Sequence, residues 1–364
     1  MAVAPNESLK LPSNIRHFAA GGEASLAQLI VTWAQKVTQP HLETYIQDAA
    51  GKPMEGFPRR LYGLIAALCA DSITGVGAAG NITAPLRAAA LARLNQLSSP
   101  TPKPAYRGPT AEVVCVDHLG LIPPDLLYRK SLYDGASLRS REELREVSSK
   151  LLQAIFTDAY IGALDPDVPK AIGGMLFELF KNTEDHGMVD VHGDLLNISI
   201  RALKASHTGV TPADLAAIVG SFEPLARYCE SLEVPVGSVQ THLFELSILD
   251  SGPGFASSWT KKPLDELTPE AEEAAVRACF EQGTSKSHDR FGQGLPHVLR
   301  LLKSERGFLR LRTGRLSFFA DYSKSDQAAE GPSVLRLWSP NDGAPLGAVS
   351  GSLLTIMLPM RRRS

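Results

Sequence analysis

The chain has 364 residues, of which 44% are hydrophobic and 21% charged, as is typical of a globular protein. Its 37 basic and 39 acidic side chains leave a formal net charge of -2, so nothing indicates binding to nucleic acid or to an anionic membrane. No apolar run approaches the roughly 20 residues that span a bilayer, and the first residues lack the pattern of a secretion signal. Four widely spaced cysteines are typical of reduced residues, so we expect a cytoplasmic protein.

The first part of the chain carries no recognisable functional motif. Apolar spacing predicts helices over residues 25–37, 42–49, 58–73, 85–97 and 138–156, and a short strand over 112–116. Asp117 and His118 follow this strand without a partner pattern, so we expect them in a loop. Two prolines in residues 164–169 favour a domain boundary there. The sequence thus predicts a mainly helical recognition or regulatory domain over residues 1–160 and a second domain over residues 161–364.

A polar stripe stands out in residues 173–187, where apolar spacing predicts a helix. Glu178 and Asn182 are four residues apart, and therefore lie on one face of that helix. Asp185 and His186 follow, and a further turn carries His186 to roughly the same face. A carboxylate, a carboxamide and an imidazole on one face suit a site that handles a metal and a water, although such residues are often only the solvated side of a helix.

A second stretch, residues 243–255, predicts a buried strand that ends at a carboxylate. Asp250 is followed by Gly252 and Gly254, with a proline between the glycines that forces a turn. The carboxylate can accept a hydrogen bond from a flat ligand, and glycines without Cβ let the backbone approach it. A simpler explanation is that Asp250 caps the turn.

A third stretch, residues 283–302, predicts a polar loop that leads into a helix. Glycines running into a helix N-terminus point free N–H groups at an anion, most often a phosphate. The residues of this stretch that we assign to the site are Thr284, Ser285, Lys286, Arg290, Gly292, Gly294 and Leu295.

The rest of the second domain predicts strands with intervening helices. We expect strands over residues 195–203, 308–312, 315–322 and 334–338, a hairpin turn at residues 313–315, and helical stretches over 211–232 and 264–282. The predicted fold class is α+β, with a mixed sheet covered by helices on one face in a two-layer sandwich.

The three stretches together resemble the GHKL superfamily of ATP-binding domains. They read Glu-x-x-x-Asn, Asp-x-Gly-x-Gly and Gly-x-Gly-Leu in the order of that superfamily, which includes gyrase B, heat-shock chaperone ATPases, sensor histidine kinases and MutL. The resemblance covers residues 169–360 and includes a closing strand over 351–359, where Ser352 replaces the usual threonine and would contact a phosphate.

This resemblance implies a role for each motif in binding ATP and Mg²⁺. Asn182 would be the one protein ligand of Mg²⁺, and Glu178 would orient or deprotonate the attacking water or hydroxyl. Asp250 would accept a hydrogen bond from the adenine amino group, with Gly252 and Gly254 against the base.

The remaining implied roles concern the phosphates and the end of the helix. Gly292 and Gly294 would wrap the phosphates, and Lys286 or Arg290 would supply charge from a lid unless both are simply solvated. Asp185 matches an aspartate of the gyrase and chaperone branches or makes local hydrogen bonds. His186, with the glycine after it, resembles the anti-sigma-factor serine kinases, or is structural.

Three functions remain open on this sequence. The first is a slow ATPase that acts as a regulatory switch, the second a serine kinase that phosphorylates a partner, and the third a nucleotide-binding sensor without turnover. Each implies an unidentified protein partner, and dimerisation is common in the superfamily. A sensor histidine kinase is disfavoured, since residues 138–156 contain no histidine.

Overall fold

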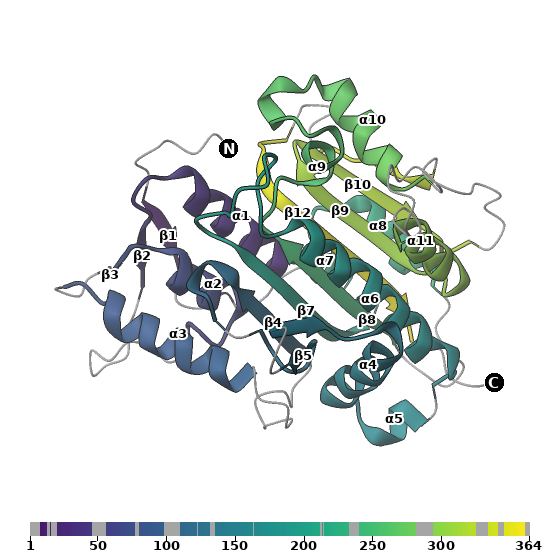
Figure 1. Cartoon of the computed structure of the whole chain (residues 1–364). Helices are drawn as coiled ribbons and strands as arrows, with labels where there is room; N and C mark the ends of the chain where they lie inside the picture. The colour runs from purple at the N-terminus through teal and green to yellow at the C-terminus, as the bar shows by residue number, and fades with distance from the viewer. Residues whose placement is uncertain are drawn as a thin grey trace.

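The computed structural model has a single large sheet with helices on both faces (Figure 1). It describes residues 8–12, 15, 20–45, 56–76, 80–97, 110–121, 123–131, 135–162, 164–211, 213, 215–232, 240–281, 294–324, 334–340 and 346–360. In spatial order the strands are β11 (Arg336–Leu337), β10 (Leu316–Asp321), β9 (Phe308–Gly314), β12 (Val349–Pro359), β8 (Thr241–Asp250), β7 (Ile200–Val210) and β4 (Thr110–Val116).

Every neighbouring pair in this sheet is antiparallel, so the expected mixed sheet is wrong. Strands β8 and β9 are joined through helices and run in the same direction. They are not neighbours, however, because β12 inserts between them and runs opposite to both. Because β12 lies between them, the sheet is antiparallel throughout even though β8 and β9 have the same direction. The hairpin turn predicted between β9 and β10 is confirmed, and Gly314 adopts a φ of 51° there.

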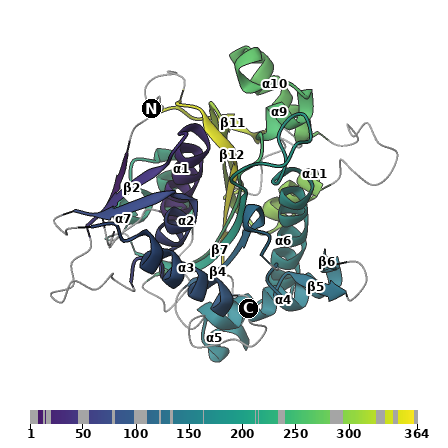
Figure 2. The ribbon, with the colours of Figure 1, turned by 60° about the vertical axis from the view of Figure 1, so that its left-hand side comes forward.

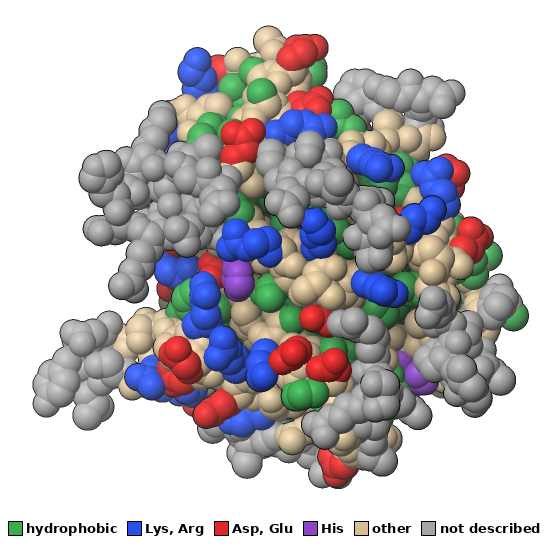
Figure 3. All heavy atoms as spheres, turned by 90° about the vertical axis from the view of Figure 1, so that its right-hand side faces the viewer, with side chains coloured by type: hydrophobic (Ala, Val, Ile, Leu, Met, Phe, Trp, Pro, Cys, Tyr) green, Lys and Arg blue, Asp and Glu red, His purple; other side chains and the backbone are tan. Residues whose placement is uncertain are grey.

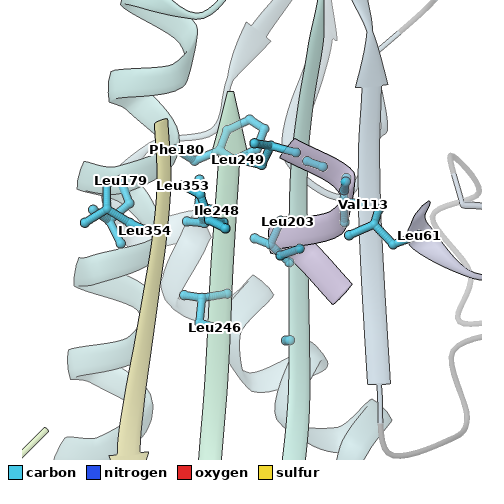
Figure 4. Packing of buried hydrophobic residues seen from close by; sticks show 14 of the residues in the cluster. Leu61, Val113, Leu179, Phe180, Leu203, Leu246, Ile248, Leu249, Leu353 and Leu354 are labelled. Carbon is cyan, nitrogen blue, oxygen red and sulfur yellow. The ribbon is translucent and has the colours of Figure 1, made fainter. Parts of the chain in front are cut away.

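One face of the sheet is covered by the helix of the Glu178 motif and two partners. These helices are α6 (Asp167–His186), α4 (Arg141–Ile155) and α11 (Gly294–Ser304), which lie together beside the sheet in Figure 2. The apolar side of α6 points inward, and Figure 4 shows Leu179 and Phe180 beside strand residues such as Leu249 and Leu354. Burial of this side explains why the predicted helix forms and why its polar side is left for the site.

The opposite face is covered by α1 (Gly22–Lys36), which packs against β12 and β8, with α2 (Leu61–Cys69) packed on α1 (Figure 2). The sheet therefore has helices on both faces, and the expectation of one covered face in a two-layer sandwich is wrong. The apolar residues of α1 and α2 require this second contact, since a helix buries its apolar stripe against another layer. The mixed α and β content agrees with the predicted α+β class.

The first part of the chain contributes strands as well as helices. A small parallel sheet consists of β1 (Leu9–Leu11), β2 (His41–Thr44) and β3 (Ser72–Gly75). The helix expected from residue 42 is therefore wrong, because these residues are instead hydrogen-bonded between two strands. Strand β4 belongs to the large sheet, and one apolar core joins both parts of the chain. The structure thus does not confirm a division at residue 160.

The remaining elements lie around this core. They are α3 (Thr83–Leu97), the hairpin of β5 (Tyr128–Ser131) and β6 (Gly135–Leu138), α5 (Asp158–Gly162), α7 (Leu215–Val219), α8 (Glu223–Ser231), α9 (Phe255–Thr260) and α10 (Pro269–Cys279).

Candidate functional site

Helix α6 carries four predicted site residues on its second half: Glu178, Asn182, Asp185 and His186. The steps of four residues keep Glu178, Asn182 and His186 on one side of the helix. Glu178 is only 9% exposed, and charged side chains are rarely so buried. At Glu178, therefore, the polar stripe is more than a solvated helix surface.

The two carboxylate oxygens of Glu178 face different elements. Oε1 forms an ion pair with the Arg141 guanidinium. Oε2 lies beside Gly294 at the start of α11, where a Cβ on the glycine would be 2.7 Å from it. The two predicted site residues Glu178 and Gly294 are therefore neighbours, and a side chain at residue 294 would collide with the carboxylate.

Asn182 lies one turn further along α6 and has an unsatisfied amide. Its Nδ2 is buried, and no described residue accepts a hydrogen bond from it. Buried side-chain amides in native proteins usually have a partner, since an unpaired one costs about 1–3 kcal/mol. An unpaired amide beside a buried carboxylate is expected where a polar ligand supplies the missing contact.

The last two residues of the stripe are less specialised. Asp185 forms an ion pair with Lys181 one turn earlier on α6, so its carboxylate has a local partner. His186 is exposed at the end of the helix. The glycine after it, Gly187, has a packing function, because a Cβ there would be 2.5 Å from the Thr183 carbonyl.

Strand β8 brings Asp250 to the C-terminal end of α6. A Cβ on Gly187 would be 3.0 Å from the Cβ of Asp250, so helix and strand meet at this point. The Gly252 N–H donates to Asp250 Oδ1 at 2.9 Å, which closes the turn after the strand. Gly252 itself lies against the backbone of His186, because a Cβ there would be 2.2 Å from that carbonyl. The structure therefore gives Gly252 a role in packing the turn onto α6.

Burial raises the pKa of Asp250 to about 7, even though the Gly252 and Ser352 amides and the Arg201 charge oppose the rise. A carboxyl with such a pKa changes its charge near neutral pH, and perturbed groups of this kind gather at functional sites. In a carboxylate that only capped a turn, hydrogen bonds from the amides would lower the pKa, and no burial penalty would raise it.

The closing strand places Ser352 directly opposite Asp250 in the sheet. The Ser352 hydroxyl is buried and 3.3 Å from that of Thr313, which also accepts the Phe255 N–H at 3.1 Å. A Cβ on Gly254, whose φ is 82°, would be 2.7 Å from the Thr313 hydroxyl. Ser352 and Gly254 thus belong to the Asp250 end of the site. The position expected for Ser352, on a phosphate, is not supported by this arrangement.

Sequence reasoning missed the buried arginine beside this end of the site. Arg201 is 2% exposed and pairs with Asp250 in the register of β7 and β8. Its Nε and Nη2 donate to both oxygens of Asp117, at 2.9 and 2.8 Å, and its Nη1 donates to Glu184 and to the Tyr128 hydroxyl at 2.5 Å. Asp117, expected to be an ordinary loop residue, is one of its two carboxylate partners. Side chains of a strand alternate between the two faces of the sheet, so a single charged residue on an apolar side of β7 was the one sequence signal for a buried arginine.

The predicted lid cannot be compared with the structure. Thr284, Ser285, Lys286, Arg290 and Gly292 lie outside the described residues. Beyond them, α11 begins at Gly294 as predicted, and Leu295 is 7% exposed among core residues. Leu295 therefore packs in the core at the start of the helix.

Comparison with known proteins identifies no relative: no protein-family model, no curated protein and no solved structure matches this chain. Within the described ranges, no group of three or more His, Cys, Asp and Glu side chains is placed to hold a metal ion. The described helices include none with the length and apolar character needed to cross a membrane. Any functional conclusion therefore rests on the site itself.

Proposed function

We propose that the site binds Mg·ATP in the manner of the GHKL superfamily and hydrolyses it slowly as a regulatory switch. The observation that carries the proposal is the contact between the second half of α6 and the Asp250 turn. Glu178 lies nine residues before the Gly187 contact, which is about 13 Å along the helix axis. An adenine held at Asp250 and a terminal phosphate near Glu178 would fit that separation.

The proposed roles follow from what each end of the site offers. Asp250 would accept a hydrogen bond from the adenine amino group, beside the buried hydroxyls of Ser352 and Thr313. At the other end, Gly294 and the backbone amides of the first turn of α11 would face the phosphates, because a helix N-terminus favours anions. The site thus offers buried hydrogen-bonding groups at one end and a helix N-terminus, which favours negative charge, at the other.

The unpaired Asn182 amide fits a site completed by ligand. Its Oδ1 would hold Mg²⁺ together with phosphate oxygens and waters, an arrangement with few protein ligands that suits this ion. The unpaired Nδ2 would then donate to a phosphate oxygen. Bound there, the ion would neutralise phosphate charge. Asp185 is engaged by Lys181, so we assign it no direct ligand contact.

Glu178 would act on the attacking water. As the water oxygen bonds to the γ-phosphorus, the bond to the bridging oxygen breaks and ADP leaves with that electron pair. Glu178 would accept the proton released by the water, which a buried carboxylate beside the phosphate is placed to do. Closure over the nucleotide would then change the surface offered to a protein partner.

The test measures ATP binding by calorimetry and phosphate release, in the parent protein and in Glu178→Ala. We expect the variant to bind ATP and to lose turnover about 100-fold or more. Glu146→Ala, an exposed glutamate on α4, is the matched control and should behave as the parent.

Other outcomes decide between the open functions. Binding without turnover in the parent would refute hydrolysis and favour phosphotransfer to a partner, or sensing. Equal turnover in parent and Glu178→Ala would remove Glu178 from the chemistry. No binding in the parent would refute the proposal.

A further inference from the structure

The ion pair between Arg141 and Glu178 concerns the control of the proposed site. Arg141 is the first residue of α4, which begins there because Ser140 and Glu143 form a capping box. The arginine side chain is 43% exposed, whereas that of Glu178 is 11% exposed. The guanidinium therefore reaches from the surface to a carboxylate that is otherwise enclosed.

Helix packing fixes the position of this arginine. A Cβ on Gly173 would be 2.7 Å from the Arg145 Cα, so α4 and α6 approach most closely at this point. The helices run in opposite directions, since Ser148 donates to the Pro169 carbonyl at 2.9 Å, one turn further along α4. One turn in the other direction brings Arg141 over the Phe177 ring, 5.4 Å from its centre.

Positive charge near Glu178 is not limited to one side chain. Figure 3, which presents the right-hand side of Figure 1, shows Lys and Arg side chains near the middle of that face with Asp and Glu side chains among them. His297 on α11 lies close enough to Arg141 and Arg300 that their charges, after burial, lower its pKa. Gly174 on α6 lies beside the same histidine, because a Cβ on this glycine would be 3.7 Å from the histidine Nε2. Among the residues that the structure describes, Arg141 thus has Glu178 as its one carboxylate partner, while Arg300 and His297 lie in the same region.

We propose that Arg141 is the residue that distinguishes ATP from ADP and that keeps Glu178 occupied while no triphosphate is bound. An Arg guanidinium pairs equally well with a carboxylate or a phosphate, because its fork of N–H donors matches both. A γ-phosphate beside Glu178 offers Arg141 a second and more highly charged partner. Arg141 then passes from Glu178 to the phosphate, and Glu178 becomes free to accept the proton of the attacking water.

The inference assigns the first part of the chain a function in the site. Residue 141 precedes the boundary predicted near residue 160, and its side chain reaches the carboxylate of Glu178 on α6. Arg141 is a positioning and specificity residue here, and it acts on the base by leaving it. This inference rests on the proposed ATP binding, and its test separates the two.

The experiment measures the affinities of the full chain for ATP and for ADP, each with Mg²⁺, by calorimetry. Arg141→Ala should weaken ATP binding about 10- to 100-fold, the range of a charge-assisted contact, and leave ADP binding unchanged. Arg141→Lys keeps the charge without the fork and should give an intermediate ratio of affinities. Arg145→Ala removes an exposed arginine one turn along α4 and should match the parent.

Each alternative result has a distinct meaning. An ATP-to-ADP affinity ratio that is the same in Arg141→Ala and the parent overturns the inference, because a purely structural ion pair cannot change that ratio. If the parent binds both ADP and ATP but Arg141→Ala leaves their affinity ratio unchanged, the role of Arg141 is refuted while the proposed ATP binding stands. If the parent binds neither nucleotide, the proposed function fails and the inference fails with it. Arg141 is exposed, so its variants are expected to fold.

Discussion

Substitution of Asp250 by Asn separates a ligand-binding carboxylate from one that only caps a turn. Asp250 has a pKa of about 7 instead of 3.8, and its ionisation therefore opposes folding by about 4 kcal/mol at pH 8. The carboxyl is half-buried, and Asn forms weaker hydrogen bonds with the Gly252 and Ser352 amides. After these losses we expect Asp250→Asn to be more stable than the parent by about 1–3 kcal/mol at pH 8.

The direction of the pH dependence follows from the raised pKa. The neutral carboxyl is favoured in the folded state, so its contribution to stability is complete below about pH 4. That contribution is lost as the pH rises through about 7, where Asp250 ionises in the folded protein. The advantage of Asp250→Asn should therefore be absent near pH 4 and reach its full size above pH 7.

The assay is urea denaturation without nucleotide at pH 5 and pH 8, together with ATP titrations of both proteins. The variant should gain stability and lose about 100-fold in ATP affinity, because it no longer offers the adenine amino group a charged acceptor. In the parent, ATP affinity should fall as the pH drops from 8 to 6. A variant that is less stable than the parent at pH 8 and binds ATP equally well would show that Asp250 merely caps the turn.

Two further substitutions test the packing and charges around the site, and a third tests a buried carboxylate elsewhere in the large sheet. Arg201→Met removes a buried guanidinium and leaves the half-buried Asp117 and Glu184 carboxylates without their cationic partner. It should cost about 3–5 kcal/mol in urea denaturation, and a loss below 1 kcal/mol would contradict this network. Gly252→Ala places a Cβ 2.2 Å from the His186 carbonyl and should cost about 1–3 kcal/mol with reduced ATP affinity, whereas unchanged stability would contradict that contact. Burial raises the pKa of Glu112 to about 7, so the stability of Glu112→Gln relative to the parent should increase between pH 5 and 8, and a pH-independent difference would refute the raised pKa.

Local patterns predicted the elements that carry the site. Helix α6 was expected from the spacing of its apolar residues, and the strand that ends at Asp250 from its apolar run and the glycines after it. These predictions succeeded because each depends on the periodicity of one segment, which burial of its apolar side then enforces. The helix expected from residue 42 failed because a four-residue strand is defined by its two neighbours and not by its own sequence.

The expected mixed sheet failed for a related reason. No local pattern indicates that the final strand inserts between β8 and β9, because strand order is set by contacts between residues far apart in the chain. The same limit applies to the second helical layer. Sequence periodicity shows that α1 has an apolar side but not which surface that side covers.

The sequence by itself determined the chemical groups of the candidate site and the helix, strand and turn on which they lie. Tertiary structure decided their partners: Arg141 on Glu178, Arg201 with Asp117 and Glu184, and the packing that requires Gly252. The physical reason is that the position of a side chain along its own element follows from local geometry. The charge it meets, and how deeply both are buried, depend on segments that only the folded chain brings together.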